Sequence, residues 1–146
     1  MIVACGVGPA CGGPLYVHVV GATALFGGVL AVTILAFAAS RYPPEQTLFA
    51  RRLTFWLTLL LVVPAWILMR AGAQWVLSQG YAKNLGWENA GSVVADGGAV
   101  LILLMLLVSW LAWKRPQLGQ LVAGLGTLYI VALGVAWFAM SYKPAW

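Results

Sequence analysis

Charged side chains are rare in this chain of 146 residues, and their spacing leaves long apolar stretches uninterrupted. No charged residue precedes Arg41, and long uncharged stretches follow Arg52, Asp96 and Arg115. A helix needs about 20 mainly apolar residues to cross the hydrocarbon layer of a bilayer. Four stretches satisfy this requirement, at about residues 15–39, 49–69, 94–113 and 118–140.

The overall composition agrees with a membrane class. Hydrophobic residues make up 63% of the chain and charged residues only 8%, whereas an ordinary soluble domain has about 25% charged residues. The net charge of +5 does not indicate a nucleic-acid partner, because the basic residues separate apolar runs instead of forming a polar surface. We therefore expect an all-α, four-transmembrane-helix bundle, one integral membrane domain over residues 1–146, with the lipid bilayer as a partner.

The short loops predict the orientation of the bundle. Short cytoplasmic loops carry an excess of Lys and Arg. The first and third predicted loops are basic, with Arg41, Arg51 and Arg52 against Glu45 in the first, and Lys114 and Arg115 in the third. This places both loops in the cytoplasm and both termini outside, in a multi-pass protein of a bacterial inner membrane.

Four ionisable residues are expected at a similar depth near the outer surface. Counted from the cytoplasmic ends at about 1.5 Å per residue, Arg70 and Asp96 lie roughly 27 Å along their helices and His18 roughly 33 Å. Lys143 follows the last span. Ionisable groups at membrane depth are costly and usually paired, so His18, Arg70, Asp96 and Lys143 form a predicted polar outer-face site with Asp96 at its centre. The alternative is that they are interfacial anchors whose charged ends reach the headgroups.

Haem or copper binding is a further hypothesis for the same end of the bundle. His18 is the single histidine of the chain, and Met69 has a similar predicted depth. A His–Met pair is known for haem iron, and copper accepts imidazole, thioether and thiolate ligands. Cys5 and Cys11, the two cysteines, would be further copper ligands, or would form a disulfide if the N-terminus faces an oxidising compartment.

Small residues suggest how the helices pack. Steps of three and four from His18 meet a stripe of small and branched residues, which directs His18 toward other helices. The stripe consists of Gly21, Ala22, Leu25, Gly28, Val29 and Val32. The fourth span is also rich in glycine, so we expect the first and fourth spans to be the tightly packed members of the bundle. Pro64 predicts a kink in the second span.

Four segments resemble a family of small, uncharacterised bacterial four-helix integral membrane proteins. They are "HVVGATALFGG", "PAWILMRAGAQW", "ADGGAV" and "MSYKP". The resemblance implies a membrane bundle and highlights His18, Arg70, Asp96 and Lys143, without implying an activity. Through a histidine and glycines in the first span, the chain is also similar to the membrane part of copper-resistance proteins, although it lacks their additional histidines and methionine clusters.

No nucleophile elbow, P-loop or HExxH helix occurs in the chain, and three acidic residues leave little for acid–base chemistry. The leading hypothesis is a non-enzymatic accessory subunit of a larger membrane complex, bound to other membrane subunits or to copies of itself. The alternatives are a haem or copper protein in electron transfer or metal handling, and a small transporter or enzyme for an apolar substrate.

Overall fold

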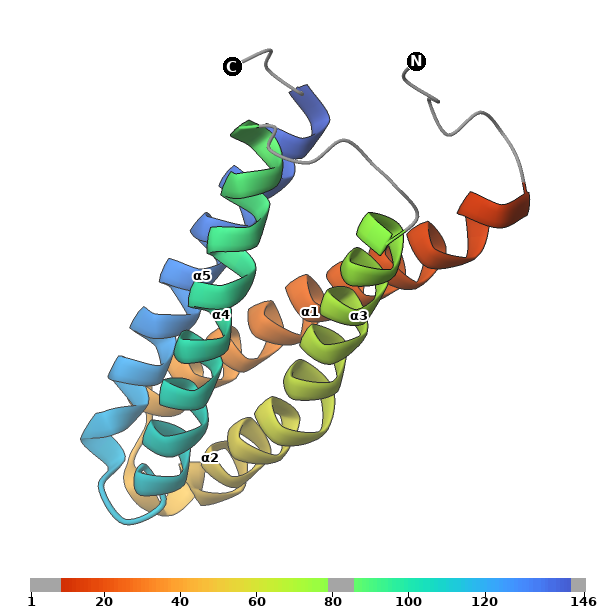
Figure 1. Ribbon diagram of the computed structural model, residues 1–146. Helices are drawn as coiled ribbons and strands as arrows, with labels where there is room; N and C mark the ends of the chain where they lie inside the picture. Colours follow the sequence, from red (N-terminus) through yellow and green to blue (C-terminus); the bar gives the residue numbers. More distant parts are fainter. Residues whose placement is uncertain (1–8, 79–85, 143–146) are drawn as a thin grey trace.

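The computed structural model describes residues 9–78 and 86–142, which are almost entirely helical (Figure 1). The elements are α1 (Pro9–Arg41), α2 (Pro44–Leu57), the π-helical turn η1 (Thr58–Val62), α3 (Val63–Ser78), α4 (Gly86–Leu111), the 3₁₀ turn η2 (Pro116–Leu118) and α5 (Gly119–Tyr142). Because α2, η1 and α3 follow one another without a break, they form one long helix over Glu45–Ser78.

Within residues 9–78 and 86–142, four helices are long and apolar enough to cross a membrane, which confirms the predicted number of spans and indicates a multi-pass membrane protein. The helices extend beyond most of the predicted limits. The exception is α4, which ends at Leu111 although the span was expected to reach residue 113. Turn residues follow as far as Lys114, and the helical conformation cannot continue through Arg115, because the residue before a proline avoids the helical region; Arg115 has φ −129° and ψ 88°.

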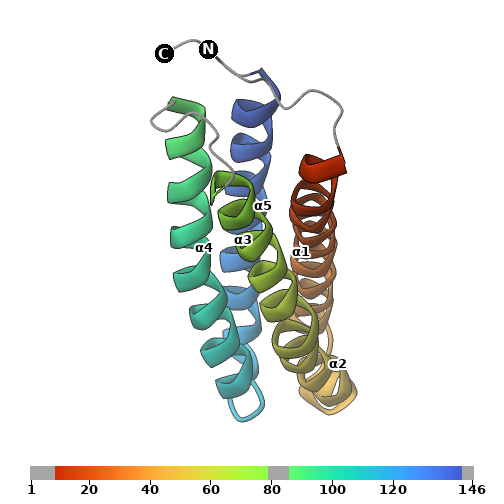
Figure 2. The ribbon, with the colours of Figure 1, turned by 45° about the vertical axis from the view of Figure 1, so that its right-hand side comes forward.

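The helices form two pairs that diverge toward one end of the molecule. In Figures 1 and 2, α1 lies beside α3, and α4 lies beside α5. Packing of α1 against α5 joins the two pairs, whereas α3 and α4 have few contacts with each other. The first and fourth predicted spans, α1 and α5, pack against each other, and α1 packs still more extensively against α3.

One face of α1 supplies the centre of the core, as its residue pattern predicted. Leu25, Val29 and Val32 are fully buried, and Gly21 and Gly28 are also buried. Residues three and four apart share one face of a helix, so this spacing turns the whole stripe, with His18 at its start, toward the neighbouring helices.

Pro64 is the second residue after the π-helical turn. A proline has no backbone N–H and cannot form the usual bond to the carbonyl four residues before it. The chain adapts by widening the preceding turn, where the Val63 N–H donates to the carbonyl of Thr58. Figure 1 shows a bend where α2 continues into α3. Beyond this bend, α3 lies beside α1.

The bundle has two ends with different charged residues. The "Arg51 end" holds the connections between α1 and α2 and between α4 and α5, with the basic residues Arg41, Arg51, Arg52, Lys114 and Arg115. The opposite "Arg70 end" holds His18, Arg70 and Asp96.

Candidate functional site

The backbones of α1 and α3 come into direct contact near the Arg70 end. A Cβ atom built on Gly21 would overlap the backbone of Met69, and a Cβ built on Gly72 would lie 2.7 Å from the His18 Cα. Carbon atoms in contact are normally about 3.5–4.0 Å apart. Glycine is therefore required at both positions, and this close approach fixes the position of His18 against α3.

The imidazole of His18 binds the backbone of α3. Its Nδ1 lies 2.9 Å from the carbonyl oxygen of Met69. A carbonyl can only accept, so Nδ1 carries the proton and donates it. His18 thereby links α1 to α3 through a main-chain group instead of through the carboxylate of Asp96.

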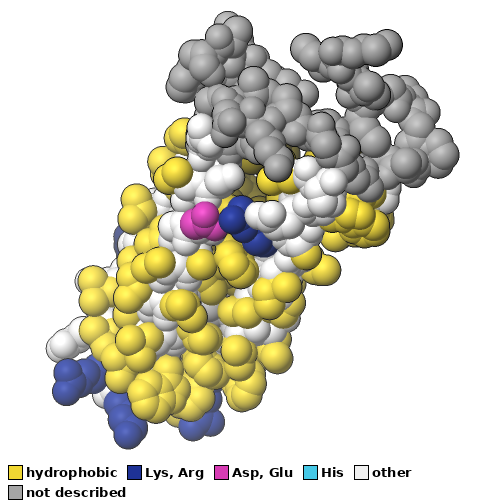
Figure 3. All heavy atoms as spheres, in the orientation of Figure 1, with side chains coloured by type: hydrophobic (Ala, Val, Ile, Leu, Met, Phe, Trp, Pro, Cys, Tyr) yellow, Lys and Arg dark blue, Asp and Glu magenta, His cyan; other side chains and the backbone are white. Residues whose placement is uncertain are grey.

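Arg70 and Asp96 form an ion pair between α3 and α4. The Arg70 Nη2 lies 2.8 Å from the Asp96 Oδ1. The Arg70 side chain is 25% exposed and the Asp96 side chain is 63% exposed in the isolated chain. Figure 3 shows an acidic and a basic side chain in contact, with apolar side chains below and beside them on the same face. Among the described residues, the pair thus borders the apolar area that lies below it on this face.

Trp66 makes a second contact between α3 and α4. Its Nε1–H donates to the carbonyl oxygen of Ala95 at 2.9 Å. Trp66 precedes Arg70 by one helical turn, so the two side chains share one face of α3, and Ala95 directly precedes Asp96, so both contacts reach the same turn of α4. Sequence analysis did not identify Trp66, although its spacing from Arg70 placed it on the same face of the helix.

These contacts connect three helices in series. His18 joins α1 to α3, and Arg70 and Trp66 join α3 to α4. They substitute for close helix packing where α3 and α4 diverge. The arrangement holds a carboxylate at the surface, where it can accept hydrogen bonds from a partner or from water in addition to the one from Arg70.

The predicted site residues are therefore only partly brought together. Arg70 and Asp96 pair, whereas His18 contacts Met69 through the main chain and not through the Met69 sulfur. Lys143 and Cys5, and the side chain of Cys11, lie outside the described residues. Within the described residues, no group of three or more His, Cys, Asp and Glu side chains is arranged to hold a metal ion.

Gly97 and Gly98, beside Asp96, have opposite surroundings. Gly97 is exposed, with no atom near the position of a Cβ. Gly98 is buried, and a Cβ there would overlap the hydroxyl of Tyr129 on α5. Next to Asp96, the exposed side of α4 consequently has no side chain at Gly97.

Comparisons with protein-family models, with curated proteins and with solved structures find no match to this chain.

Proposed function

We propose that this protein is a non-enzymatic accessory subunit of a larger complex in a bacterial inner membrane, and that a partner membrane subunit or a second copy binds at the Arg70–Asp96 pair. The observation that carries the proposal is the Asp96 carboxylate, which is 63% exposed on an apolar face near one end of the spans. A partner that donates hydrogen bonds to the carboxylate would lower the cost of a charge at this depth.

The surface around Asp96 also suits a close partner. Exposed Gly97 has no side chain to hold another helix away, and small residues allow membrane helices to approach closely. Arg70 already faces the carboxylate at 2.8 Å, so the pair is held in place before a partner binds.

The orientation of the bundle belongs to the same proposal. The Arg51 end carries five basic residues, Arg41, Arg51, Arg52, Lys114 and Arg115, and one acidic residue, Glu45. The positive-inside bias assigns this end to the cytoplasm. The Arg70–Asp96 pair then faces the outer surface, together with both termini.

Association is tested in native membranes solubilised with a mild detergent. Wild-type protein is expected to migrate on a native gel as a complex larger than the 15.6 kDa chain in its micelle, and Asp96→Asn should shift much of it to the smaller size. Glu45→Gln is the matched control, because it makes the same chemical change at an exposed position of the other end. Migration of the wild type as a single chain, or equal effects of the two variants, would contradict the proposal.

Orientation is tested by labelling single cysteines in intact cells. Glu45→Cys and Asn89→Cys, each made in a background with Cys5→Ser and Cys11→Ser, place a thiol at exposed positions of opposite ends. A membrane-impermeant reagent should label position 89 and not position 45. Labelling of position 45 and not of position 89 would show that the bundle has the opposite orientation.

A further inference from the structure

The Arg70–Asp96 pair keeps hydrogen-bonding capacity that the contact between its two members does not use. A guanidinium has five N–H donors, and a carboxylate has two acceptor oxygens. Within the described part of the chain, the ion pair joins one guanidinium nitrogen, Nη2, to one carboxylate oxygen, Oδ1. The Asp96 side chain is 63% exposed and the Arg70 side chain 25%. Both charges can therefore form further contacts with a molecule that lies on this face.

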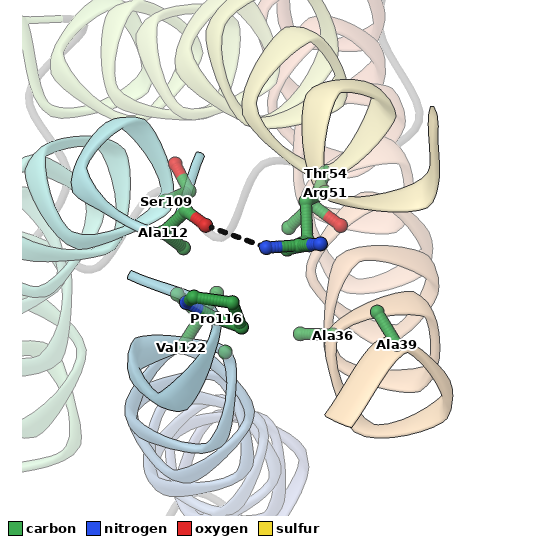
Figure 4. Close-up of a pocket in the computed structure, with 9 residues that line it drawn as sticks. Ala36, Ala39, Arg51, Thr54, Ser109, Ala112, Pro116 and Val122 are labelled. Carbon is green, nitrogen blue, oxygen red and sulfur yellow. Dashed lines mark hydrogen bonds between the residues drawn. The ribbon is translucent and has the colours of Figure 1, made fainter. Parts of the chain in front are cut away.

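The buried cation at the opposite end of the bundle is bound within the chain. Arg51 is 6% exposed. Its Nη1 donates to the carbonyl oxygen of Ala112 at 3.3 Å, and its Nε to that of Thr47 at 3.4 Å (Figure 4). Ala112 follows the last residue of α4, where the helix dipole is negative. The charge of Arg51 is thus directed into the fold, whereas the Arg70–Asp96 pair lies at the surface.

The pair presents two opposite charges side by side on neighbouring helices (Figure 3). A partner with a single cation would be attracted by Asp96 and repelled by Arg70, and a single anion would meet the reverse. A complementary surface must therefore carry one cation and one anion in the opposite order. Two-fold rotation of this chain supplies that surface, because residue i contacts residue j and j contacts i across a two-fold interface.

The common level of the two charges meets a requirement that the membrane imposes on such a rotation. Copies that insert with the same orientation are related by a two-fold axis along the membrane normal, and this rotation keeps every residue at its own depth. Arg70 and Asp96 contact each other across α3 and α4, so they lie at one level. The rotation can consequently bring Arg70 of each copy against Asp96 of the other.

The surface beside the pair permits the approach of another helix. Gly97 is exposed with no atom near the position of a Cβ, and small residues let membrane helices come close. Val100, Leu103 and Leu107 follow Asp96 at steps of three and four on the exposed side of α4, and they are 58%, 64% and 52% exposed. Lipid covers such apolar side chains as well as protein does, so it is the order of the charges that identifies the occupant.

We infer that a second copy of this chain binds at the pair, with Arg70 of each copy against Asp96 of the other. The four charges then alternate in sign, and each carboxylate lies between two guanidinium groups. A network of several charges is more stabilising than an isolated exposed pair. The inference rests on the accessory-subunit proposal, for which it names the partner.

Exchange of the two charges tests this arrangement. Two full-length chains with different affinity tags are produced together, solubilised in a mild detergent and purified through one tag. The double variant Arg70→Asp with Asp96→Arg keeps an ion pair within each chain and reverses its order. Wild type should copurify with wild type, and exchanged chain with exchanged chain. The mixed combination should copurify about tenfold less or lower, because like charges meet at both contacts. Equal copurification in all three combinations, or in none, would overturn the inference.

A second variant tests the interface if the exchanged chain does not fold. Gly97→Leu adds a bulky side chain beside Asp96, and Gly27→Leu makes the same change at an exposed glycine of α1. Neither new Cβ meets an atom of the described chain, so both variants should fold. Gly97→Leu should reduce copurification of the two tagged forms about fivefold or more, as expected for overpacking of a close contact, and Gly27→Leu should not. Equal effects of the two variants would reject an interface at Asp96.

The composition of the native complex separates this inference from the proposal on which it rests. A complex larger than one chain, from which differently tagged copies do not copurify, would overturn the second copy and retain the accessory-subunit role with another subunit as partner. Migration of the wild type as a single chain would overturn both.

Discussion

Substitution of Gly72 by alanine should weaken the bundle, because α1 and α3 have no room for a side chain where they cross. The new Cβ would lie 2.7 Å from the His18 Cα and 3.0 Å from the His18 Cβ. Carbon atoms need about 3.5–4.0 Å. The nearest atoms belong to the backbone of α1 and cannot rotate away, so the helices must separate by roughly 1 Å.

The expected change in the free energy of unfolding combines two losses and one gain. Overpacking of a well-packed contact costs about 1–3 kcal/mol. Separation of the helices would also stretch the 2.9 Å bond from His18 to the Met69 carbonyl, and loss of a typical hydrogen bond costs about 0.5–1.5 kcal/mol. Alanine regains about 0.5–1 kcal/mol through its greater helix propensity. The net effect is a loss of about 0.5–4 kcal/mol in the free energy of unfolding.

Gly27→Ala is the matched control, because Gly27 is exposed on α1 with no atom near the position of a Cβ. Unfolding of both variants in a mild detergent, followed by circular dichroism and tryptophan fluorescence, would compare them with the wild type. Gly72→Ala should unfold at a lower temperature, and Gly27→Ala at the wild-type temperature or above. A Gly72→Ala protein as stable as the Gly27→Ala protein would refute the close crossing of α1 and α3.

Three further predictions concern individual contacts. A double-mutant cycle of Asp96→Asn and Arg70→Gln in detergent should give a coupling free energy of about 0–1 kcal/mol, because the pair is partly exposed. A coupling near the roughly 3–5 kcal/mol that is typical of breaking a buried pair would contradict this geometry. Tyr129→Phe should keep or raise stability, by up to about 1–3 kcal/mol, because its buried hydroxyl has no hydrogen-bond partner within the described part of the chain; a clear loss would reveal an unseen partner. Cys5 and Cys11 should be bridged in protein isolated without reductant, and alkylation of both thiols before reduction, followed by mass measurement, would disprove the bridge.

The spacing of charges predicted the spans and the pair of Arg70 with Asp96 because both depend on the fixed rise of a helix. Arg70 and Asp96 lie at equal numbers of residues from the Arg51 end, so the two residues reach the same level of the bundle. At this level the carboxylate pairs with the guanidinium. Depth alone does not determine the direction in which a side chain points around its helix. The contact of His18 with the Met69 carbonyl follows from the crossing of α1 and α3, which depends on glycines in both helices and on the bend before Pro64.

The same limitation explains why the sequence groups Arg51 with Arg52 among the basic residues of the first loop, at the start of the second span. A count of charges along the chain treats Arg51 and Arg52 alike, yet one is 6% exposed and the other is exposed. The signal that separates them is the series of threonines at positions 47, 54 and 58, which shares the helical spacing of Arg51. Three hydroxyl residues on the same face as a cation indicate a polar inward face, whereas Arg52 has no such series.

The charged groups at the two ends of the bundle consequently differ in burial: one end has a surface ion pair and the other a buried guanidinium. At the Arg70 end the ion pair lies on the surface, where α3 and α4 diverge, so a change there should alter association more than folding. At the Arg51 end the guanidinium lies inside and binds the end of α4, so a change there should alter folding. Asp96→Asn and Arg51→Gln therefore separate the two ends: the first should leave the unfolding temperature nearly unchanged and reduce the size of the complex, and the second should lower the unfolding temperature. If both variants lowered stability equally and left association intact, neither end would serve the role proposed for it.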